Sequence, residues 1–157
     1  MSRHFLLYWL PETVERHLNE NYLLNHAGSN QLNRAAAGDV LWIVTTGEAD
    51  ELGLAGRLQV GAVVSLGEAK RRLGRNDLWA SRWHAIAAMG TARRMCGSSL
   101  IDVAHQLRFV DTGPTKLFVS AHGGISSDQL RRMRELDVAS SRLLSQTFNQ
   151  SLSIQTN

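Results

Sequence analysis

The sequence contains very little cysteine and no long hydrophobic run, and both absences exclude classes of protein. Cys96 is the only cysteine among the 157 residues, so an internal disulfide and a zinc site built on paired cysteines are both excluded. The longest apolar run, Phe5 to Leu10, is too short to span a bilayer, and no small-residue cleavage site follows it. These features lead us to expect a cytoplasmic protein with no membrane partner.

Signatures of common catalytic sites are missing as well. The sequence has neither the Gly-x-Ser-x-Gly turn of many hydrolases nor a Walker-type phosphate loop. Six histidines are present, but no two of them have the i, i+4 spacing with an intervening glutamate that marks many zinc enzymes. We therefore expect no catalytic residue, no metal ion and no other cofactor.

Length and composition fit a single globular domain. Apolar residues make up 43% of the chain, which is typical of a protein with an ordinary hydrophobic core. No linker rich in Pro, Gly or Ser divides the sequence, and it has no internal repeat. We expect one domain over residues 1–148 and a polar, disordered tail over residues 149–157.

Apolar patterns predict strands in the middle of the chain and helices around them. The predicted strands are residues 5–10, 40–44, 52–64, 83–88 and 117–120. The predicted helices are residues 12–19, 29–36, 68–73 and 126–134, and a last helix that Asp137 caps. Glycines inside residues 52–64 predict bulges or close backbone approach. The order indicates an α+β fold, a small twisted β-barrel with helices packed around it.

Positive charge is concentrated in the second half of the chain. The 17 Lys and Arg residues exceed the 14 Asp and Glu residues by three. Residues 1–78 contain 8 basic and 9 acidic side chains, whereas residues 79–157 contain 9 basic and 5 acidic ones. This asymmetry predicts a positive face, which favours a partner that carries phosphate groups.

Tryptophan and asparagine residues supply candidate binding groups. Trp79 and Trp83 lie in a polar stretch beside arginine and histidine, where an indole ring can stack on a nucleobase or, alternatively, fill the core. Asn25, Ser29 and Asn30 precede a predicted helix. An asparagine side chain carries both a donor and an acceptor, so it can read the edge of a base or cap the helix.

The order of several motifs resembles a known family. Tyr8-Trp9-Leu10 ends the first predicted strand, and Asn25 and Asn30 stand before Gly38-Asp39 and the apolar strand 40–44. A glycine-containing segment and a closing helix follow. Over most of its length the chain therefore resembles the EVE family of the PUA-like superfamily, which is related to YTH and ASCH domains.

The resemblance implies a PUA-like barrel that reads a modified, for example methylated, nucleobase in DNA or RNA without catalysis. It also implies a nuclease or a modification enzyme as a partner. The implied base pocket contains Trp9, Asn25, Asn30, Thr45 and Thr46, and Ser29, Trp79, Trp83 and His84 join it on chemical grounds. We expect Arg82, Arg93 and Arg94 to hold the flanking phosphates.

Two other functions fit the sequence. An ASCH-like hydrolase or nuclease would use His84 or His26 as its acid–base group. Asp39 or Asp77 would orient that histidine from within hydrogen-bond reach. A module that binds a protein or a small metabolite would keep its tryptophans in the core and expose Gly53–Gly61 as a sheet edge.

Overall fold

The fold comes from a computed structural model of the chain, which describes residues 2–20 and 22–155. Its helices are α1 (Pro11–Asn19), α2 (Leu66–Leu73) and α3 (Val138–Gln155). Its strands are β1 (His4–Tyr8), β2 (Leu23–Leu24), β3 (His26–Ser29), β4 (Val40–Thr46), β5 (Leu52–Ser65), β6 (Trp83–Ala87), β7 (Arg93–Arg94), β8 (Ser98–Ser99) and β9 (Arg134–Leu136). Short 3₁₀ turns lie at Leu32–Arg34, Glu48–Asp50, Ala104–Gln106 and Ser127–Leu130.

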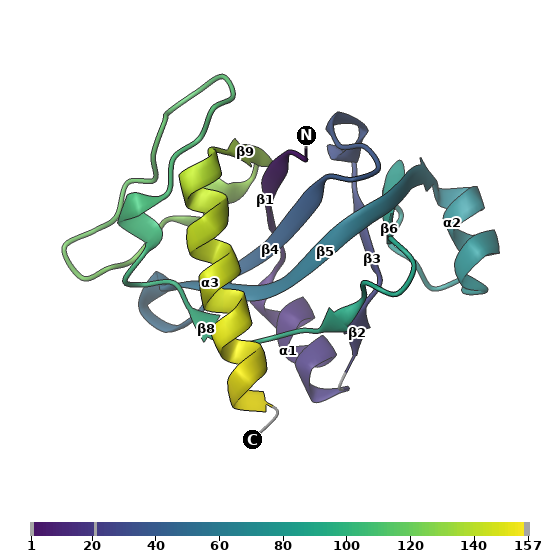
Figure 1. Cartoon of the computed structure of the whole chain (residues 1–157), viewed down its shortest axis with the longest axis horizontal. Coiled ribbons are helices and arrows are strands. Elements are labelled where there is room, and N and C mark those ends of the chain that lie inside the picture. The colour runs from purple at the N-terminus through teal and green to yellow at the C-terminus, as the bar shows by residue number, and fades with distance from the viewer. Residues whose placement is uncertain (1, 21, 156–157) are drawn as a thin grey trace.

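The strands form an open sheet in the order β3-β6-β5-β4-β1-β9, and β8 pairs with β5 (Figure 1). β1 and β4 are parallel, and the other pairs in the sheet are antiparallel. β2 and β7 form a separate two-stranded sheet. Within the described residues the edge strands β3 and β9 are not paired with each other, so the sheet does not close. The predicted α+β class is confirmed, and a closed barrel is not.

Alternation along β1 and β4 builds a hydrophobic core on each face of the sheet. On one face, the buried side chains of Leu6, Val40, Trp42 and Val44 form a cluster with Leu144 and Phe148 of α3. On the other face, beside α1, lie those of Phe5, Leu7, Val14, Leu41 and Ile43. Successive side chains of a strand point to opposite faces, so both faces of these strands are buried, as their continuous apolar sequence predicts.

β5 is the longest strand and lies inside the sheet, with β4 on one side and β6 and β8 on the other. Gly61 sits at a break in the register with β6, where a Cβ would lie 2.8 Å from the Cα of Ala88. A Cβ at Gly56 would lie 2.8 Å from the Cδ2 of Leu24. The predicted bulge and close approach are confirmed, whereas the interpretation of Gly53–Gly61 as an exposed edge is wrong.

The helix ends follow local capping signals. Pro11 is the first residue of α1, and the Oγ of Ser65 accepts a hydrogen bond from the backbone N–H of Glu68 at the start of α2. Gly74 ends α2 in the left-handed conformation, at a φ of 65°. The Oδ1 of Asp137 accepts from the backbone N–H of Ser140 at 2.8 Å, which confirms the predicted cap of α3.

Three predicted elements differ from the structure. Residues 117–120 form no strand, because the side-chain amide of Gln129 accepts from the N–H of Phe118 and donates to its carbonyl. A side chain thus takes the place of a partner strand. Residues 126–134 form only a 3₁₀ turn, since the chain becomes extended at Arg134 to pair β9 with β1. Residues 29–36 also form only a short turn, because Ser29 belongs to β3.

The end of the chain also differs from the prediction of a disordered tail. α3 continues to Gln155, so residues 149–155 are helical, and residues 156–157 lie outside the described residues. Leu152, one helical turn beyond Phe148, packs against the core on the same side. Of the helices described here, none is long and apolar enough to cross a membrane.

Candidate functional site

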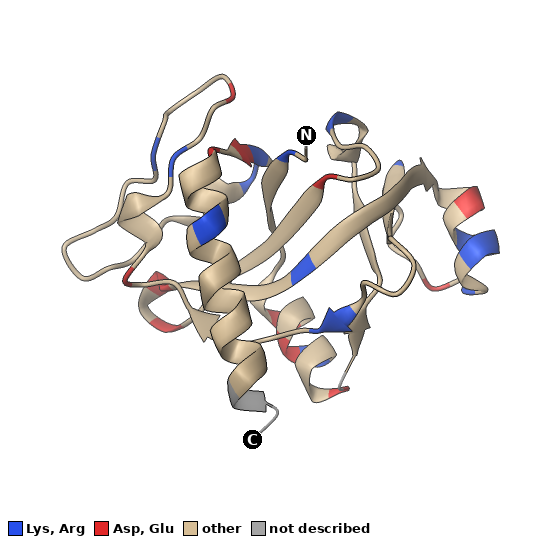
Figure 2. Ribbon diagram, viewed as in Figure 1, with Lys and Arg blue, Asp and Glu red and all other residues tan. Residues whose placement is uncertain are grey.

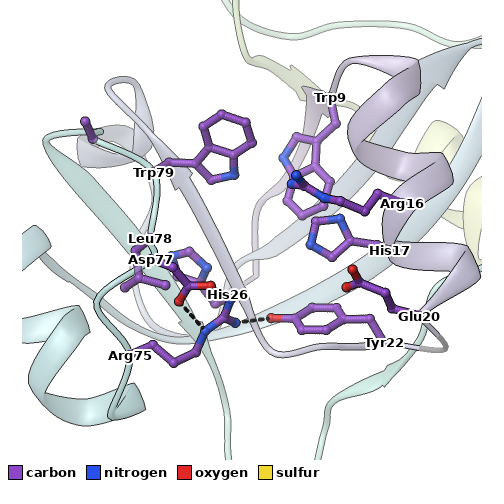
Figure 3. A pocket seen from close by; sticks show the side chains of 11 residues that line it. Trp9, Arg16, His17, Glu20, Tyr22, His26, Arg75, Asp77, Leu78 and Trp79 are labelled. Carbon is purple, nitrogen blue, oxygen red and sulfur yellow. Dashed lines mark hydrogen bonds and ion pairs between the residues drawn. The ribbon is translucent and has the colours of Figure 1, made fainter.

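The candidate site is a pocket of about 490 Å³ between α1 and the loop that joins α2 to β6 (Figure 3). It is lined by Trp9, Arg16, His17, Glu20, Tyr22, His26, Arg75, Asp77, Leu78, Trp79 and Ala80. Pockets for small ligands usually measure roughly 300–1,000 Å³. The pocket is therefore large enough for a small ring system.

Two tryptophans form its aromatic walls. Trp9 follows β1, and its backbone N–H donates to the carbonyl of Val44 at 2.9 Å, which fixes the residue at the end of the sheet. Trp79 comes from the α2–β6 loop and is 49% exposed. Figure 3 shows the two indole rings on opposite sides of the pocket. Both also border a second hollow of about 170 Å³, so they stand between two adjoining depressions.

His17 and Tyr22 extend the aromatic wall below Trp9. The ring centroid of His17 lies 5.5 Å from that of Trp9 and 4.7 Å from that of Tyr22, which it meets edge-on. The Nδ1 of His17 donates to the carbonyl of Thr13 at 2.7 Å, because a carbonyl oxygen only accepts. The rings of Trp9, His17 and Tyr22 thus form one row, with His17 of α1 in the middle.

A polar network runs across the pocket from Tyr22, beside α1, to the loop that joins α2 to β6 (Figure 3). The hydroxyl of Tyr22 donates to the Oδ1 of Asn25 at 2.9 Å and accepts from Arg75 at 3.2 Å. Arg75 also donates two hydrogen bonds, of 2.9 and 3.0 Å, to the carboxylate of Asp77 (Figure 3). These hydrogen bonds from Arg75 lower the pKa of Asp77. The network keeps the loop that carries Trp79 next to the segment that carries Tyr22.

A buried pair of histidines lies behind this network. The Nε2 of His26 and the Nδ1 of His84 are 2.6 Å apart, and the Nε2 of His84 is 3.0 Å from the carbonyl of Ser81. Burial lowers the pKa of both rings, and repulsion from His84 helps to lower that of His26 to about 4. Only His26 lines the pocket, since His84 has no solvent exposure.

The pair does not have the geometry expected of the hydrolase alternative. Within residues 2–20 and 22–155, no hydrogen bond or ion pair joins either histidine to Asp39 or Asp77. Asp39 is buried and bonds to Arg3 at 2.9 Å, and Asp77 is held by Arg75. Neither of these two aspartates is therefore positioned to orient His26 or His84.

Two of the nine residues predicted for the base pocket line it. Trp9 and Trp79 line the pocket, whereas Asn25 and His84 support lining residues from behind. Asn30 accepts a hydrogen bond of 2.7 Å from the backbone N–H of Arg82, which ties the turn after β3 to the loop before β6.

The other four predicted residues lie outside the pocket. The Oγ of Ser29 accepts from the backbone N–H of Gln31, and Trp83 is half-buried against the core in β6. Thr46 is 3.2 Å from the hydroxyl of Tyr8. Thr45 lines a different hollow, beside Cys96, and its hydroxyl is buried without a partner.

Of the three arginines predicted to hold phosphates, one lies next to the pocket. Arg94 lines a small cavity next to the pocket, and His17 and Tyr22 line both. Arg82 and Arg93 line neither the cavity nor the pocket. Arg16 lines the pocket itself. Figure 2 shows Lys and Arg spread over many elements of the molecule.

Sequence reasoning missed most of the lining residues. Arg16 lies on the exposed side of α1, and Glu20 caps the end of this helix. Their i, i+4 spacing was the signal in the sequence that could have placed them side by side. Their charges, with those of Arg75 and Asp77, leave the lining without a net charge when the histidines are neutral. Such a lining suits a neutral ring with polar edges.

Neither a metal site nor a reactive thiol stands out in the described part of the chain. No group of three or more His, Cys, Asp or Glu side chains is placed there to hold a metal ion. Cys96 is buried, and burial raises the pKa of its thiol.

The chain shows no match to protein-family models or to curated proteins. The geometry of the pocket therefore carries the functional argument.

Proposed function

We propose that this chain is a non-catalytic nucleic-acid-binding module that holds a modified nucleobase between Trp9 and Trp79. The observation that carries the proposal is the pair of indole rings on opposite sides of one pocket (Figure 3). Stacking on an aromatic side chain is worth about 1–3 kcal/mol for each base, and it replaces the stacking that a flipped base loses.

The lining favours a base over a charged ligand. Two arginines and two carboxylates balance each other, and Leu78 and Ala80 add apolar surface beside Trp79. A methyl group on the base gains about 1–3 kcal/mol in such surroundings, which is about 10- to 200-fold in affinity. The resemblance to the EVE family, with its PUA-like fold and its reading of modified bases, supports the same proposal.

Arginines near the pocket supply contacts for the nucleic-acid backbone. In the described residues no ion pair engages Arg16, Arg82 or Arg94, so their guanidinium groups are available to phosphates. Neutralising phosphates releases counterions, so binding weakens as salt rises. Arg16→Ala should reduce this salt dependence, whereas Arg142→Ala, an exposed arginine on α3, should leave it unchanged.

The proposal is tested by fluorescence anisotropy with single-stranded DNA and RNA oligonucleotides that contain one methylated base or its unmethylated counterpart. At low salt the chain should bind a methylated oligonucleotide at least about tenfold more tightly than the unmethylated one. Trp79→Ala should weaken that binding about tenfold or more, because it removes one stacking wall. The variant should still fold, since the side chain is half-exposed.

Phe118→Ala is the matched control. Phe118 is also an exposed aromatic residue, at 77%, but it lines a separate hollow far from the tryptophans in sequence. Its removal should leave the affinity unchanged. Absence of binding to every oligonucleotide at low salt, or equal affinities of the two variants, would contradict the proposed function.

A further inference from the structure

The protonation pattern of the buried histidine pair is fixed by its neighbours. The carbonyl of Ser81 only accepts hydrogen bonds, so the Nε2 of His84, 3.0 Å away, carries a hydrogen. His84 has no solvent exposure, and His26 is 6% exposed. Burial lowers the pKa of both rings, so each is neutral and has one hydrogen near pH 7.

One hydrogen on each ring then determines both tautomers. Because the hydrogen of His84 is on Nε2, its Nδ1 is an acceptor, and the Nε2 of His26, 2.6 Å away, must be the donor. The Nδ1 of His26 is therefore left with a lone pair and no hydrogen. A single backbone carbonyl thus sets the chemical character of an atom two hydrogen bonds away.

This lone pair is unpartnered, and it belongs to a residue that lines the pocket. His26 lines the pocket, and its only side-chain hydrogen bond is the one between its Nε2 and His84. In the described part of the chain, the one buried side-chain nitrogen or oxygen without a partner is the Oγ1 of Thr45. The Nδ1 of His26 has no partner and is not among the fully buried atoms, so it is accessible, and it belongs to a residue that lines the pocket.

We infer that His26 determines specificity, its bare Nδ1 selecting ligands that present an N–H group to the floor of the pocket. The inference rests on the proposed function and narrows its ligand class to bases with a free or singly methylated amino group. A doubly methylated amino group has no hydrogen to donate, so it would leave a buried acceptor without a partner. In this arrangement His84 is a positioning residue, because it acts only through His26.

The tautomer is measured directly on the free protein by NMR correlation of histidine side-chain nitrogens with ring protons. At pH 7 the account predicts a hydrogen on the Nε2 of both rings and none on the Nδ1 of His26. A hydrogen on that Nδ1 would overturn the inference, whatever the protein binds. This readout needs no ligand and no variant.

Binding then tests the ligand class. Oligonucleotides with N6-methyladenine and N6,N6-dimethyladenine, and with N4-methylcytosine and N4,N4-dimethylcytosine, are compared by anisotropy. In at least one of these pairs the singly methylated base should bind about tenfold more tightly, as expected for one buried hydrogen bond. Similar affinities within both pairs would overturn the inference.

A variant separates the hydrogen bond from the bulk of the second methyl group. In His26→Phe the acceptor is gone, so the preference for the singly methylated base should fall to within about twofold. A preference that survives in the folded variant is steric and overturns the inference. If the variant does not fold, the tautomer in the wild-type protein decides. Absence of binding to all four oligonucleotides would overturn this ligand class even with a bare Nδ1, whereas the proposed function falls only if no methylated oligonucleotide of any kind binds.

Discussion

The histidine pair makes the stability of the fold depend on pH in a defined direction. The pKa of His26 is about 4 in the folded chain, against an ordinary value of 6.5, because burial and repulsion from His84 disfavour its charged form. Between pH 6.5 and pH 4 the unfolded chain therefore binds a proton that the folded chain does not. The contribution of His26 to the free energy of unfolding should therefore fall as the pH falls through this window. Above the window this contribution should be constant.

The magnitude follows from the two pKa values. Each pKa unit corresponds to about 1.36 kcal/mol, so His26 contributes a loss of up to about 3 kcal/mol by pH 4. The pKa of His84 is lowered as well, which acts in the same direction. A loss of this size is a large part of the stability of a small domain, about 5–15 kcal/mol.

Urea unfolding at a series of pH values, followed by circular dichroism, measures the effect. In His26→Gln the amide nitrogen can still donate to His84 but does not titrate, so its free energy of unfolding should fall less between pH 7 and pH 4.5 than that of the wild type. His122→Gln, at an exposed histidine, should behave as the wild type does. Parallel curves for the wild type and His26→Gln would refute the reasoning.

Two further predictions concern the supports of the fold. Gly28→Ala should destabilise the chain by about 1–3 kcal/mol, because a Cβ there would lie 2.8 Å from the Cε1 of His84. Gly67→Ala in α2 meets nothing within 4 Å and should be neutral or stabilising, and equal effects in thermal unfolding would contradict this. Asp111→Ala should cost about 3 kcal/mol in urea unfolding, since it leaves a buried arginine without its carboxylate. Asp128→Ala, at an exposed pair, should change little, and a similar loss there would count against the argument.

Local signals in the sequence were sufficient to predict the central strands of the fold and the helix that follows them. The apolar runs of β1 and β4 predicted strands buried on both faces, and Gly74 marked the end of α2. Gly61 predicted a bulge in β5. Each of these signals depends on residues close together in the chain.

The errors came from contacts between distant residues. The side chain of Gln129 completes the hydrogen bonds of Phe118, and the pairing of β9 with β1 ends the helical turn before Arg134. Leu152 keeps α3 helical beyond the predicted boundary by packing on the core. No local pattern contains this information, because tertiary contacts override intrinsic preferences.

The candidate site was only partly predictable for the same reason. The family resemblance pointed to Trp9 and the stacking ability of an indole ring pointed to Trp79, although Trp83, with the same sequence context as Trp79, is half-buried in β6. His17 belongs to α1 and Arg75 to the loop after α2, and only the fold brings them to one pocket. Their sequence positions carry no sign of this proximity.

The most direct test of the central claim follows the four tryptophan indole N–H signals by NMR during titration with the methylated oligonucleotides. The signals of Trp9 and Trp79 should move on binding, because their rings hold the base. That of Trp42 should not move, since this residue is fully buried and its Nε1 donates to His4 at 3.0 Å. Binding that leaves the signals of Trp9 and Trp79 unchanged would contradict the account.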